Sequence, residues 1–375
     1  MQIQGVLQRQ LELRHQQRRH RSLSVPTAVH DFSGNDYLGL SQHPQVRDAF
    51  QQGVQQWGTG SGSSPLVAGY QTPHAYLRRQ LSEWLERDNV LLFSSGFGAN
   101  QCTMRALAPL YDRVLLDRLS HASLLDGVRE QRHWKRFAHN DAVHAKKLLN
   151  PDATNLIVTE SVFSMDGDSA PLHELAALDA DLWVDDAHGL GIVGADGRSA
   201  ASQLSQTQAP LITATFGKAL GVMGAALVGT DSVIDYLVNY GREFIYSTAF
   251  PAAQAAAVSA AIKIVQSAEG ARLRQQLDTN VALFSELAAR VNIPLGTSQH
   301  AIQTLVVGSD ANVMNIGVAL NSQGFKCGTI RPPTVPEGTA RLRITLTAQH
   351  KEADIRAFVA ALADCYHRLT ETEVV

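Results

Sequence analysis

The feature that most restricts the fold of this chain is an alternation, between about residues 75 and 250, of short apolar runs with longer segments of helical periodicity. Runs of this kind are typical of strands buried on both faces, and helices between them indicate parallel strand pairing. We therefore predict an α/β fold in which helices cover both faces of a large, mostly parallel sheet. The strand-like runs are Val90–Phe93, Val114–Leu116, Leu156–Val158, Leu182–Val184 and Leu211–Ala214.

The pattern changes after about residue 262, where we predict a smaller α+β unit. Residues 302–307 and 325–330 are strand-like and flank a predicted helix at residues 311–323. Residues 341–347 alternate strictly between polar and apolar side chains, which indicates a strand with one solvated face. A closing amphipathic helix follows this strand.

The first 40 residues are predicted to form a separate segment. Residues 3–21 have the apolar spacing of an amphipathic helix with a basic far end, and residues 31–40 contain too many turn formers for a regular element. The predicted domains are therefore an N-terminal segment (1–40), a large domain (41–262) and a small C-terminal α+β domain (263–375).

Composition excludes several classes of protein. Of the 375 residues, 45% are hydrophobic and 18% are charged, and the net charge is −3, so neither disorder nor general attraction to nucleic acid or anionic lipid is expected. The longest uncharged apolar stretch, residues 249–262, is too short to span a bilayer, and the N-terminus lacks the apolar core of a secretory signal. Three cysteines without CxxC spacing argue against a disulfide framework or a zinc site. We expect a cytoplasmic protein that binds neither membrane nor metal.

Chemistry is expected at the carboxyl ends of the strands, where ligands collect in parallel α/β sheets. After the first run, Ser94–Asn100 opens a predicted helix. Its main-chain N–H groups and the positive end of the helix dipole could hold an anion such as phosphate. A glycine-containing turn at this place can also be a simple connector.

Three other strand ends carry residues suited to catalysis. Asp185 and Asp186 follow one buried strand, and strand alternation sends their side chains to opposite faces. Lys218 follows another strand in a glycine-rich segment, where desolvation would lower its pKa and give the free amine that a Schiff base needs. His121 follows a third strand. In isolation, an aspartate could cap a turn, a loop lysine usually lies on the surface, and a lone histidine is more often structural.

One motif raises the alternative of a nicotinamide-dependent dehydrogenase. Gly189–Gly194 matches G-x-G-x-x-G and follows a strand, but a dinucleotide fold then needs a helix and an acidic residue about 20 positions on. Residues 195–198 have the composition of another turn, and no Asp or Glu occurs between Asp196 and Asp231. The dehydrogenase hypothesis is therefore weak.

The remaining strand ends fit one cofactor. An aspartate that keeps a pyridine nitrogen protonated, a lysine with a free amine and a helix start that binds phosphate are the parts of a pyridoxal phosphate site. Protonation of the ring nitrogen lets the ring act as an electron sink. We therefore predict pyridoxal 5′-phosphate, held by Asp185, Lys218 and the turn around Gly96, in the large domain.

Nearly the whole chain also resembles the α-oxoamine synthases, a family of acyltransferases that depend on pyridoxal phosphate. The resemblance rests on several motifs in the same order. They are residues 33–40 (SGNDYLGL), 119–124 (LSHASL), 162–168 (VFSMDGD), 184–189 (VDDAHG), 215–218 (TFGK) and 330–336 (IRPPTVP). The resemblance implies fold type I, that of aspartate aminotransferase, and a homodimer with active sites at the subunit interface.

The resemblance also implies a role for each matching residue. Lys218 would form the Schiff base and later remove the Cα proton, and Asp185 would pair with the pyridine nitrogen. His188 would contact the phenolic oxygen, and His121 would stack on the ring. Further cofactor contacts would come from Gly96, Phe97, Ser164, Thr215 and Thr248 of the partner subunit. Substrate contacts would come from Asn35, His121, Arg331, Thr334 and an arginine of the first helix, Arg18 by alignment, with Arg19 and Arg21 as alternatives.

The implied reaction is the decarboxylative condensation of L-alanine with a pimeloyl thioester, carried on coenzyme A or acyl carrier protein. This is the biotin-pathway branch of the family, which residues 330–336 resemble most. Glycine C-acetyltransferase and 5-aminolevulinate synthase activities are alternatives within the family, and a non-catalytic pyridoxal-binding regulator is a remote one. Two features depart from the family pattern: the link from the first helix to Phe32 is short, and Leu66 stands where a histidine is expected.

Overall fold

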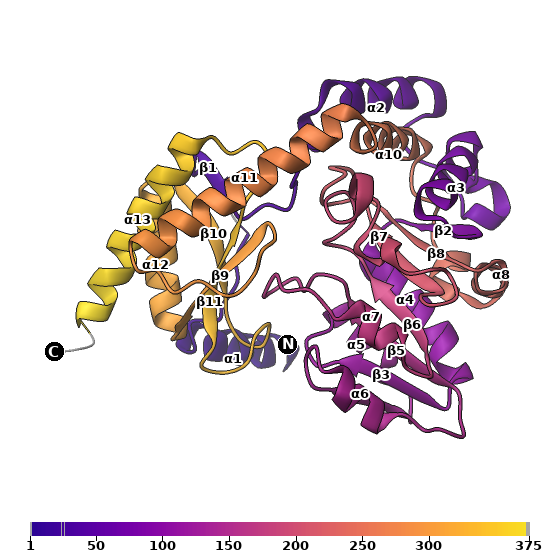
Figure 1. The fold of residues 1–375 in the computed structure, drawn as a ribbon, viewed down its shortest axis with the longest axis horizontal. Helices are drawn as coiled ribbons and strands as arrows, with labels where there is room; N and C mark the ends of the chain where they lie inside the picture. Colours follow the sequence, from indigo (N-terminus) through magenta and orange to yellow (C-terminus); the bar gives the residue numbers. More distant parts are fainter. Residues whose placement is uncertain (1, 24, 26, 373–375) are drawn as a thin grey trace. The chain divides into compact units, whose positions relative to one another are not determined.

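The computed structural model describes residues 2–23, 25 and 27–372, which form two compact units. The larger unit comprises residues 35–164 and 169–275, and the smaller unit comprises residues 1–34, 165–168 and 276–375. Figure 1 shows the two units as ribbons. The predicted domain boundaries after residues 40 and 262 remain predictions.

A mixed sheet forms the centre of the larger unit, as predicted. Among the described residues, seven strands lie in the order β2-β8-β7-β6-β5-β3-β4, and only β8 runs antiparallel to its neighbours. The strands are β2 (Asn89–Phe93), β3 (Arg113–Asp117), β4 (Trp134–Phe137), β5 (Asn155–Glu160), β6 (Asp181–Asp185), β7 (Leu211–Thr215) and β8 (Ala225–Gly229). The helices are α2 (Pro44–Trp57), α3 (Thr72–Leu85), α4 (Gly96–Leu107), α5 (Ala122–Val128), α6 (Ala142–Leu148), α7 (Leu172–Ala176), α8 (Asp231–Tyr240), α9 (Arg242–Tyr246) and α10 (Ala252–Val265).

Two of these strands were not among the predicted apolar runs. The edge strand β4 carries Lys135 and Arg136, both exposed, so it presents no continuous apolar run. Strand β8 is buried throughout, but it begins with two alanines directly after a glycine-rich segment. The charged residues of β4 and the two small alanines of β8 leave each strand with few large apolar side chains, which is why periodicity alone did not identify them.

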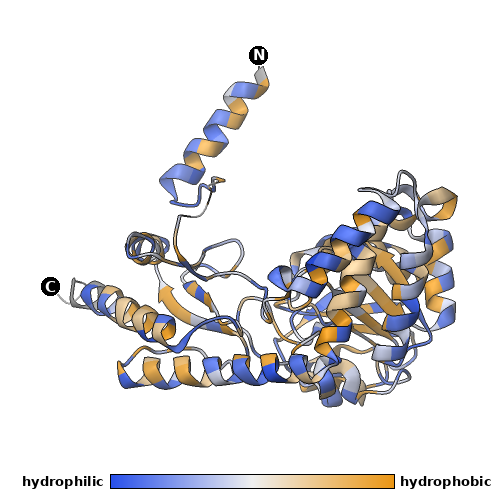
Figure 2. Cartoon of the chain, turned by 90° about the horizontal axis from the view of Figure 1, so that it is seen from above, coloured by the Kyte–Doolittle hydropathy of each residue, from blue (hydrophilic) through white to orange (hydrophobic). Residues whose placement is uncertain are grey.

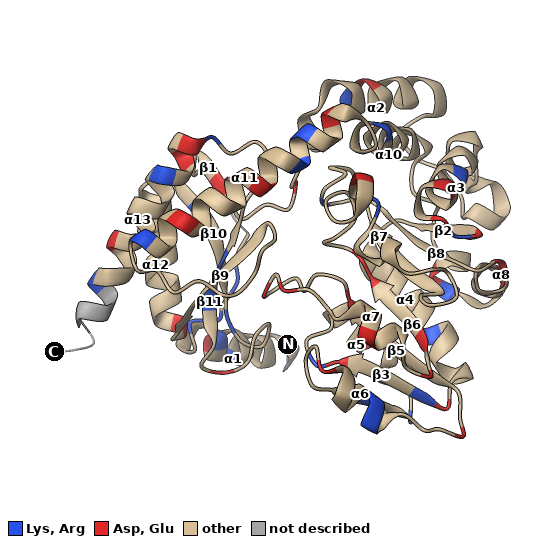
Figure 3. Ribbon diagram, in the orientation of Figure 1, with Lys and Arg blue, Asp and Glu red and all other residues tan. Residues whose placement is uncertain are grey.

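Alternation along the strands produces two separate hydrophobic cores, one on each face of the sheet. Val158 and Trp183 pack into the core that contains α4 and α5, whereas Ile157 and Val184 pack into the core that contains α6 and α7. Figure 3 shows that most of the charged residues lie on helices and loops. In β5, β6 and β7 acidic residues stand only at strand ends.

The smaller unit contains a second sheet, with strand order β1-β10-β11-β9. Its elements are α1 (Gln2–Gln16), β1 (His30–Phe32), β9 (Ile302–Gly308), α12 (Asp310–Ser322), β10 (Phe325–Ile330), β11 (Ala340–Thr345) and α13 (Glu352–Thr372). Helix α11 (Ala268–Arg290) begins in the larger unit and ends in this one. The predicted strands and helices after residue 300 are confirmed to within a few residues.

Three sequence-based expectations for the smaller unit were wrong in part. Strand β11 is buried along its whole length rather than half-solvated, because Arg341 forms an ion pair with Asp166 and Arg343 donates to Thr345. The turn-rich stretch at residues 31–40 contributes to β1, which pairs in parallel with β10. Helix α1 ends at Gln16, five residues earlier than predicted.

Helix α1 is an amphipathic helix whose apolar side chains are exposed in this structure. Ile3, Leu7 and Leu11 are each more than half exposed. Figure 2 shows hydrophilic and hydrophobic residues interspersed along this N-terminal helix. The helix stops where Arg18 takes a positive φ of 55°, which turns the chain out of the helical path. Over the described residues, we find no helix with the length and apolarity needed to cross a bilayer.

Candidate active site

The site is built where β5, β6 and β7 end. Glu160, Asp185 and Thr215 close these three strands, and each has the strand parity of the residues that face α4 and α5. The adjacent strands therefore present their last side chains on one face of the sheet. The next residue, Asp186, has the opposite parity and points to the other face, as predicted.

A buried chain of hydrogen bonds orients Asp185. The Trp183 indole N–H donates to the Thr213 hydroxyl at 2.9 Å, and that hydroxyl donates to Asn100 Oδ1 at 2.9 Å. The Asn100 amide is thereby turned so that its N–H group donates to Asp185 Oδ2 at 2.6 Å. Asp185 Oδ1 accepts the main-chain N–H of Ala187 at 3.1 Å. Because donors face both oxygens, this carboxylate is held as a fixed anion although only 4% of the residue is exposed.

His121 caps the start of α5 and lies close to this carboxylate. Its Nδ1 accepts the main-chain N–H of Ser123 at 3.3 Å and lies 2.8 Å from the Ser123 hydroxyl. The residue has an exposed side in the single chain, yet the surrounding protein desolvates the ring and lowers its pKa; the Asp185 carboxylate opposes this shift and the Lys218 ammonium adds to it. A neutral ring with one open face is suited to stacking on a flat ligand.

Lys218 lies in a tight turn after β7. The Phe216 N–H donates to the Gly224 carbonyl at 2.9 Å, and the Gly221 N–H donates to the Lys218 carbonyl at 2.9 Å. Gly221 has a φ of 67°, and a Cβ there would strike the main chain of Ser41. The Lys218 side chain is half-buried, so the single chain desolvates the ammonium less than the sequence suggested. Its charge nevertheless lowers the pKa of both His121 and Glu160, which places it near them.

His188 is buried and contacts a second polar chain. Its Nδ1 lies 2.6 Å from the Tyr37 hydroxyl, which in turn lies 3.3 Å from Asn35 Oδ1. Asn35 and His188, predicted from separate motifs, are thus joined through Tyr37, which sequence reasoning had given no role. The signal was present, because Tyr37 stands inside the same motif as Asn35.

The start of α4 approaches the end of β7. The Ser95 hydroxyl caps the helix by accepting the Gly98 N–H at 3.1 Å. A Cβ on Gly96 would lie 2.6 Å from Thr215 Cγ2, so only glycine allows this approach without a shift. The exposed Phe97 lies edge-on to His121, with ring centroids 6.3 Å apart. The N–H groups of this turn are therefore available to an anion beside the Asp185 carboxylate.

The two remaining predicted cofactor residues, Ser164 and Thr248, lie in different loops of the larger unit. Ser164 is half-buried, and its main-chain N–H donates to Glu160 Oε2 at 3.3 Å. Thr248 is exposed in the loop after α9. It does not take part in the cluster around Asp185, which agrees with its expected use by a neighbouring subunit but does not test it.

Two buried acids were not predicted to shape the site. Burial, together with the neighbouring Asp185 carboxylate, raises the pKa of Glu160 to about 8. Burial likewise raises the pKa of Asp186 to about 7, while the hydroxyls of Ser161 and Ser199 oppose the shift. Asp186 Oδ2 accepts the main-chain N–H of Ala200 at 3.3 Å, at the start of the 3₁₀ turn Ala200–Gln203. The strand register pairs Glu160 with Asp185, and the only signal in the sequence is that each acid follows an apolar run.

The glycine motif at residues 189–194 does not start a helix. A single 3₁₀ turn, Ala195–Gly197, follows it, and the Gly191 N–H donates to the Gly197 carbonyl at 2.7 Å. The motif therefore forms a compact loop over the end of β6. This geometry contradicts the dinucleotide-binding alternative, which required a helix at this place.

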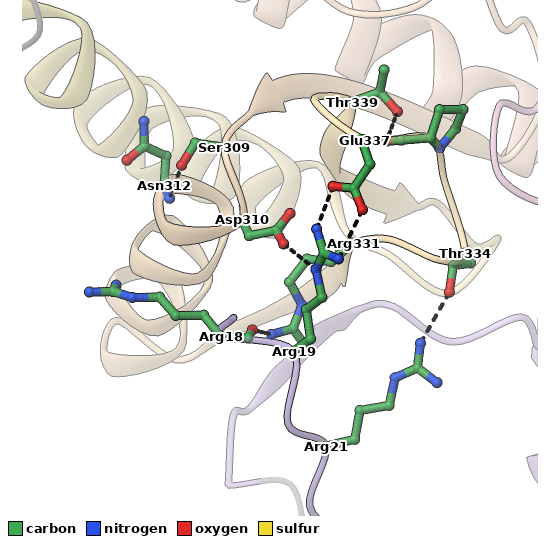
Figure 4. A network of polar contacts seen from close by, with 11 residues as sticks. Arg18, Arg19, Arg21, Ser309, Asp310, Asn312, Arg331, Thr334, Glu337 and Thr339 are labelled. Carbon is green, nitrogen blue, oxygen red and sulfur yellow. Dashed lines mark hydrogen bonds and ion pairs between the residues drawn. The ribbon is translucent and has the colours of Figure 1, made fainter. Parts of the chain in front are cut away.

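A second cluster of predicted residues lies in the smaller unit (Figure 4). Arg331 donates to the carbonyl oxygen of Arg18, and Arg21 donates to the Thr334 hydroxyl at 3.1 Å. Arg19 is held between two carboxylates, Asp310 at 2.7 Å and Glu337. Figure 4 shows the Arg18 side chain pointing away from Arg331 and the Arg21 side chain pointing to Thr334. We call Arg18, Arg19, Arg21, Arg331 and Thr334 the arginine cluster.

Known proteins resemble this chain over most of its length. Residues 27–362 match the aminotransferase class I and II family. A protein of Cronobacter sakazakii named 8-amino-7-oxononanoate synthase is 48% identical over 341 residues, which cover 89% of this chain and 88% of the relative. One of the same name from Pectobacterium atrosepticum is 47% identical over 339 residues, 88% of this chain and 87% of the relative.

Solved structures with a similar fold include a serine palmitoyltransferase and an 8-amino-7-oxononanoate synthase. Serine palmitoyltransferase from S. paucimobilis, solved with pyridoxal phosphate joined to myriocin, superimposes with a TM-score of 0.85 at 25% identity over 91% of this chain and 88% of that one. The 8-amino-7-oxononanoate synthase of Francisella tularensis has a TM-score of 0.81 at 24% identity, over 93% of this chain and 99% of that one. At that identity the second likeness concerns the fold alone.

Proposed function

We propose that this chain, which belongs to the aminotransferase class I and II family and within it to the 8-amino-7-oxononanoate synthases, uses pyridoxal phosphate to condense L-alanine with a pimeloyl thioester. Its fold is fold type I, as the resemblance implied. The products are 8-amino-7-oxononanoate, CO2 and the released thiol carrier. The observation that carries the proposal is the Asp185 carboxylate, which Asn100 of α4 holds at the carboxyl end of β6, with His121 close to both this carboxylate and Lys218.

The residues present fit pyridoxal phosphate. Asp185 is a buried anion that can hold a proton on a pyridine nitrogen, and Gly96 allows the α4 N–H groups to come close to a phosphate. When bound, the protonated ring supplies an electron sink for the pair left on the alanine Cα. His121, Ser164 and Thr215 would hold the ring and phosphate from the sides.

Lys218 and His188 have separate proposed duties. Lys218 supplies the amine that holds the cofactor and, once released from it, takes the Cα proton of alanine. His188, oriented by the Tyr37 hydroxyl, would donate to the phenolic oxygen of the cofactor. Asn35, on the other side of Tyr37, would meet the substrate. These roles follow the family pattern, position by position.

The arginine cluster is proposed to bind substrate carboxylate. Arg331 and Thr334 would act there as in the family, together with an arginine from the N-terminal segment. The alignment selects Arg18 for this duty, but its side chain points away from Arg331, whereas Arg21 contacts Thr334. We therefore propose Arg21 as the acyl-binding arginine and keep Arg18 as the alternative.

A homodimer is proposed on independent grounds. The larger unit exposes several large apolar side chains in the single chain, among them Leu66, Val67, Met223 and Tyr246. A second copy of the chain that covers these side chains would remove them from water, and Thr248 of the partner subunit could then reach the phosphate. Sedimentation of the purified chain tests this, since a monomer at micromolar concentration would contradict the proposal.

The decisive experiment concerns Lys218. The purified chain, reconstituted with pyridoxal phosphate, should show a visible absorbance band that Lys218→Ala loses and that Lys263→Ala, a helix α10 control, keeps. Native protein that stays colourless after reconstitution would overturn the proposal. For substrate choice, alanine, glycine and serine are assayed against pimeloyl, succinyl and acetyl thioesters on both carriers. Faster turnover of glycine with a succinyl or acetyl thioester would overturn the pimeloyl assignment and leave the cofactor proposal standing.

A further inference from the structure

Two carboxyl groups meet at the base of the site. Glu160 ends β5 and Asp185 ends β6, and the two residues are direct partners in the parallel register. Both lie on the face covered by α4 and α5, and they are only 2% and 4% exposed. Two ionised carboxylates so close and so deeply buried would repel each other strongly, so one of them is expected to keep its proton.

The hydrogen bonds distinguish the two acids. Asp185 accepts an amide N–H on each oxygen, from Asn100 at 2.6 Å and from Ala187 at 3.1 Å. Glu160 accepts a long contact from the Ser164 N–H at 3.3 Å on Oε2, and the His121 main-chain N–H acts on the carboxyl more weakly. No hydrogen bond reaches its buried Oε1 among the described residues. The better-solvated acid is Asp185, so the negative charge belongs there and the proton belongs on Glu160.

The charges around Glu160 support the same assignment. Burial and the Asp185 carboxylate raise the pKa of Glu160 to about 8, while the Lys218 ammonium and the N–H groups of Ser164 and His121 act in the opposite direction. These groups come from β6, the turn after β7, the loop after β5 and the start of α5. At pH 7 the carboxyl is therefore mostly neutral.

We propose that Glu160 is a positioning residue of the site, a neutral carboxylic acid that keeps Asp185 as the single anion at the base and anchors the Ser164 main chain beside it. The proposal rests on the proposed function for the use of the Asp185 charge by a cofactor, whereas the protonation of Glu160 is a property of the chain itself. A neutral acid leaves the Asp185 charge undivided for the cofactor's ring nitrogen.

Stability against pH tests the protonation without the cofactor. The folded-state pKa of about 8 is above the ordinary value of 4.5, so stability from this group is fully present below about pH 4.5 and is lost as pH rises through about 8. Between about pH 6 and pH 9 the urea midpoint of the full-length wild-type chain should fall more than that of Glu160→Gln. Glu174→Gln, an exposed control on α7, should follow the wild type. Equal slopes for wild type and Glu160→Gln would overturn the proposal.

A second variant keeps the test valid if Glu160→Gln does not fold. Asp185→Asn removes the charge that raises the pKa of Glu160, so the pH-dependent loss of stability should move to lower pH in that variant. An unmoved transition would overturn the proposed coupling of the two acids.

The holoenzyme provides the functional arm of the test. With pyridoxal phosphate bound, the visible spectrum of the wild type should change as the Glu160 carboxyl loses its proton with rising pH, and Glu160→Gln should lose this change while keeping the band. A band that titrates identically in both proteins would overturn the role of Glu160. Failure of the chain to bind pyridoxal phosphate at all would instead contradict the proposed function, and the stability arm would still decide the protonation.

Discussion

The base of the site and the arginine cluster place functional side chains in opposite ways. At the base, Glu160, Asp185 and Thr215 are the last residues of neighbouring strands. Backbone pairing fixes Glu160 beside Asp185, and Thr215 lies two residues beyond Thr213, the register partner of Asp185, on the same face of the sheet. In the arginine cluster, Arg19 reaches Asp310 and Glu337 across 291 and 318 residues of sequence, at partly exposed positions. The first arrangement is rigid and desolvated, and the second consists of surface contacts that are individually weak.

This difference predicts different consequences of substitution. Low dielectric at the base amplifies every charge, so changes there should alter cofactor binding, catalysis and pH dependence. In the arginine cluster water screens each ion pair, so changes should alter substrate affinity far more than chemistry.

The largest effect is expected from Asp185→Asn. The variant keeps the shape but removes the anion that holds a proton on the ring nitrogen, so kcat should fall about 1,000-fold, or about 4 kcal/mol. Steady-state kinetics with alanine and the pimeloyl thioester measure it. Asp181→Asn, at the exposed start of the same strand, is the control and should keep near wild-type kcat. A kcat within about threefold of wild type for Asp185→Asn would refute the charge-based account of the base.

Strand parity explains why the base could be predicted from the sequence. Asp185 stood at the end of an apolar run, so alternation alone separated it from Asp186, and the glycines beside Lys218 marked a close approach. Asn100 and Tyr37 could not be assigned from the sequence alone, because their partners come from other elements. Glu160 needed the strand register, which requires knowing that β5 and β6 are neighbours.

The arginine cluster could be predicted only in part. The motif at residues 330–336 identified Arg331 and Thr334, but neither spacing nor alignment could determine which arginine of the N-terminal segment faces them. That choice depends on the path of the chain after α1, where Arg18 takes a positive φ of 55° and the chain leaves the helical path.

An intermediate effect is expected from Asp186→Asn, which lies at the base but on the opposite face. Its folded-state pKa of about 7 is above the ordinary 3.8, so its stabilising contribution is fully present below about pH 3.8 and is lost as pH rises through 7. Between pH 5 and pH 7 the unfolding free energy of wild type should fall relative to the variant by about 2 kcal/mol. Urea denaturation across this range measures it. A constant difference between the two proteins would show that Asp186 is ionised throughout.

The smallest effect tests the arginine cluster itself. Arg21→Ala should raise KM for the pimeloyl thioester about tenfold, or about 1.4 kcal/mol, with kcat nearly unchanged, because an exposed carboxylate–arginine contact contributes binding but no chemistry. Arg18→Ala should change KM less than about twofold, since its contribution to Arg331 is a main-chain carbonyl that alanine retains.

The comparison of Arg18 and Arg21 is informative because the two residues lie three positions apart on one segment and carry the same charge. A general loss of positive charge would raise KM equally in both variants. Loss of the contacts that Arg19 makes with Asp310 and Glu337 would also raise KM equally in both. A difference in KM between the two variants therefore requires a direct contact of one arginine with the substrate. A larger KM change in Arg18→Ala than in Arg21→Ala would return the acyl-binding role to Arg18, and would mean that the segment turns by one helical step when substrate binds. The same pair assayed with an acetyl thioester, which has no distal carboxylate, should show no difference, because the charge that Arg21 is proposed to bind is then absent.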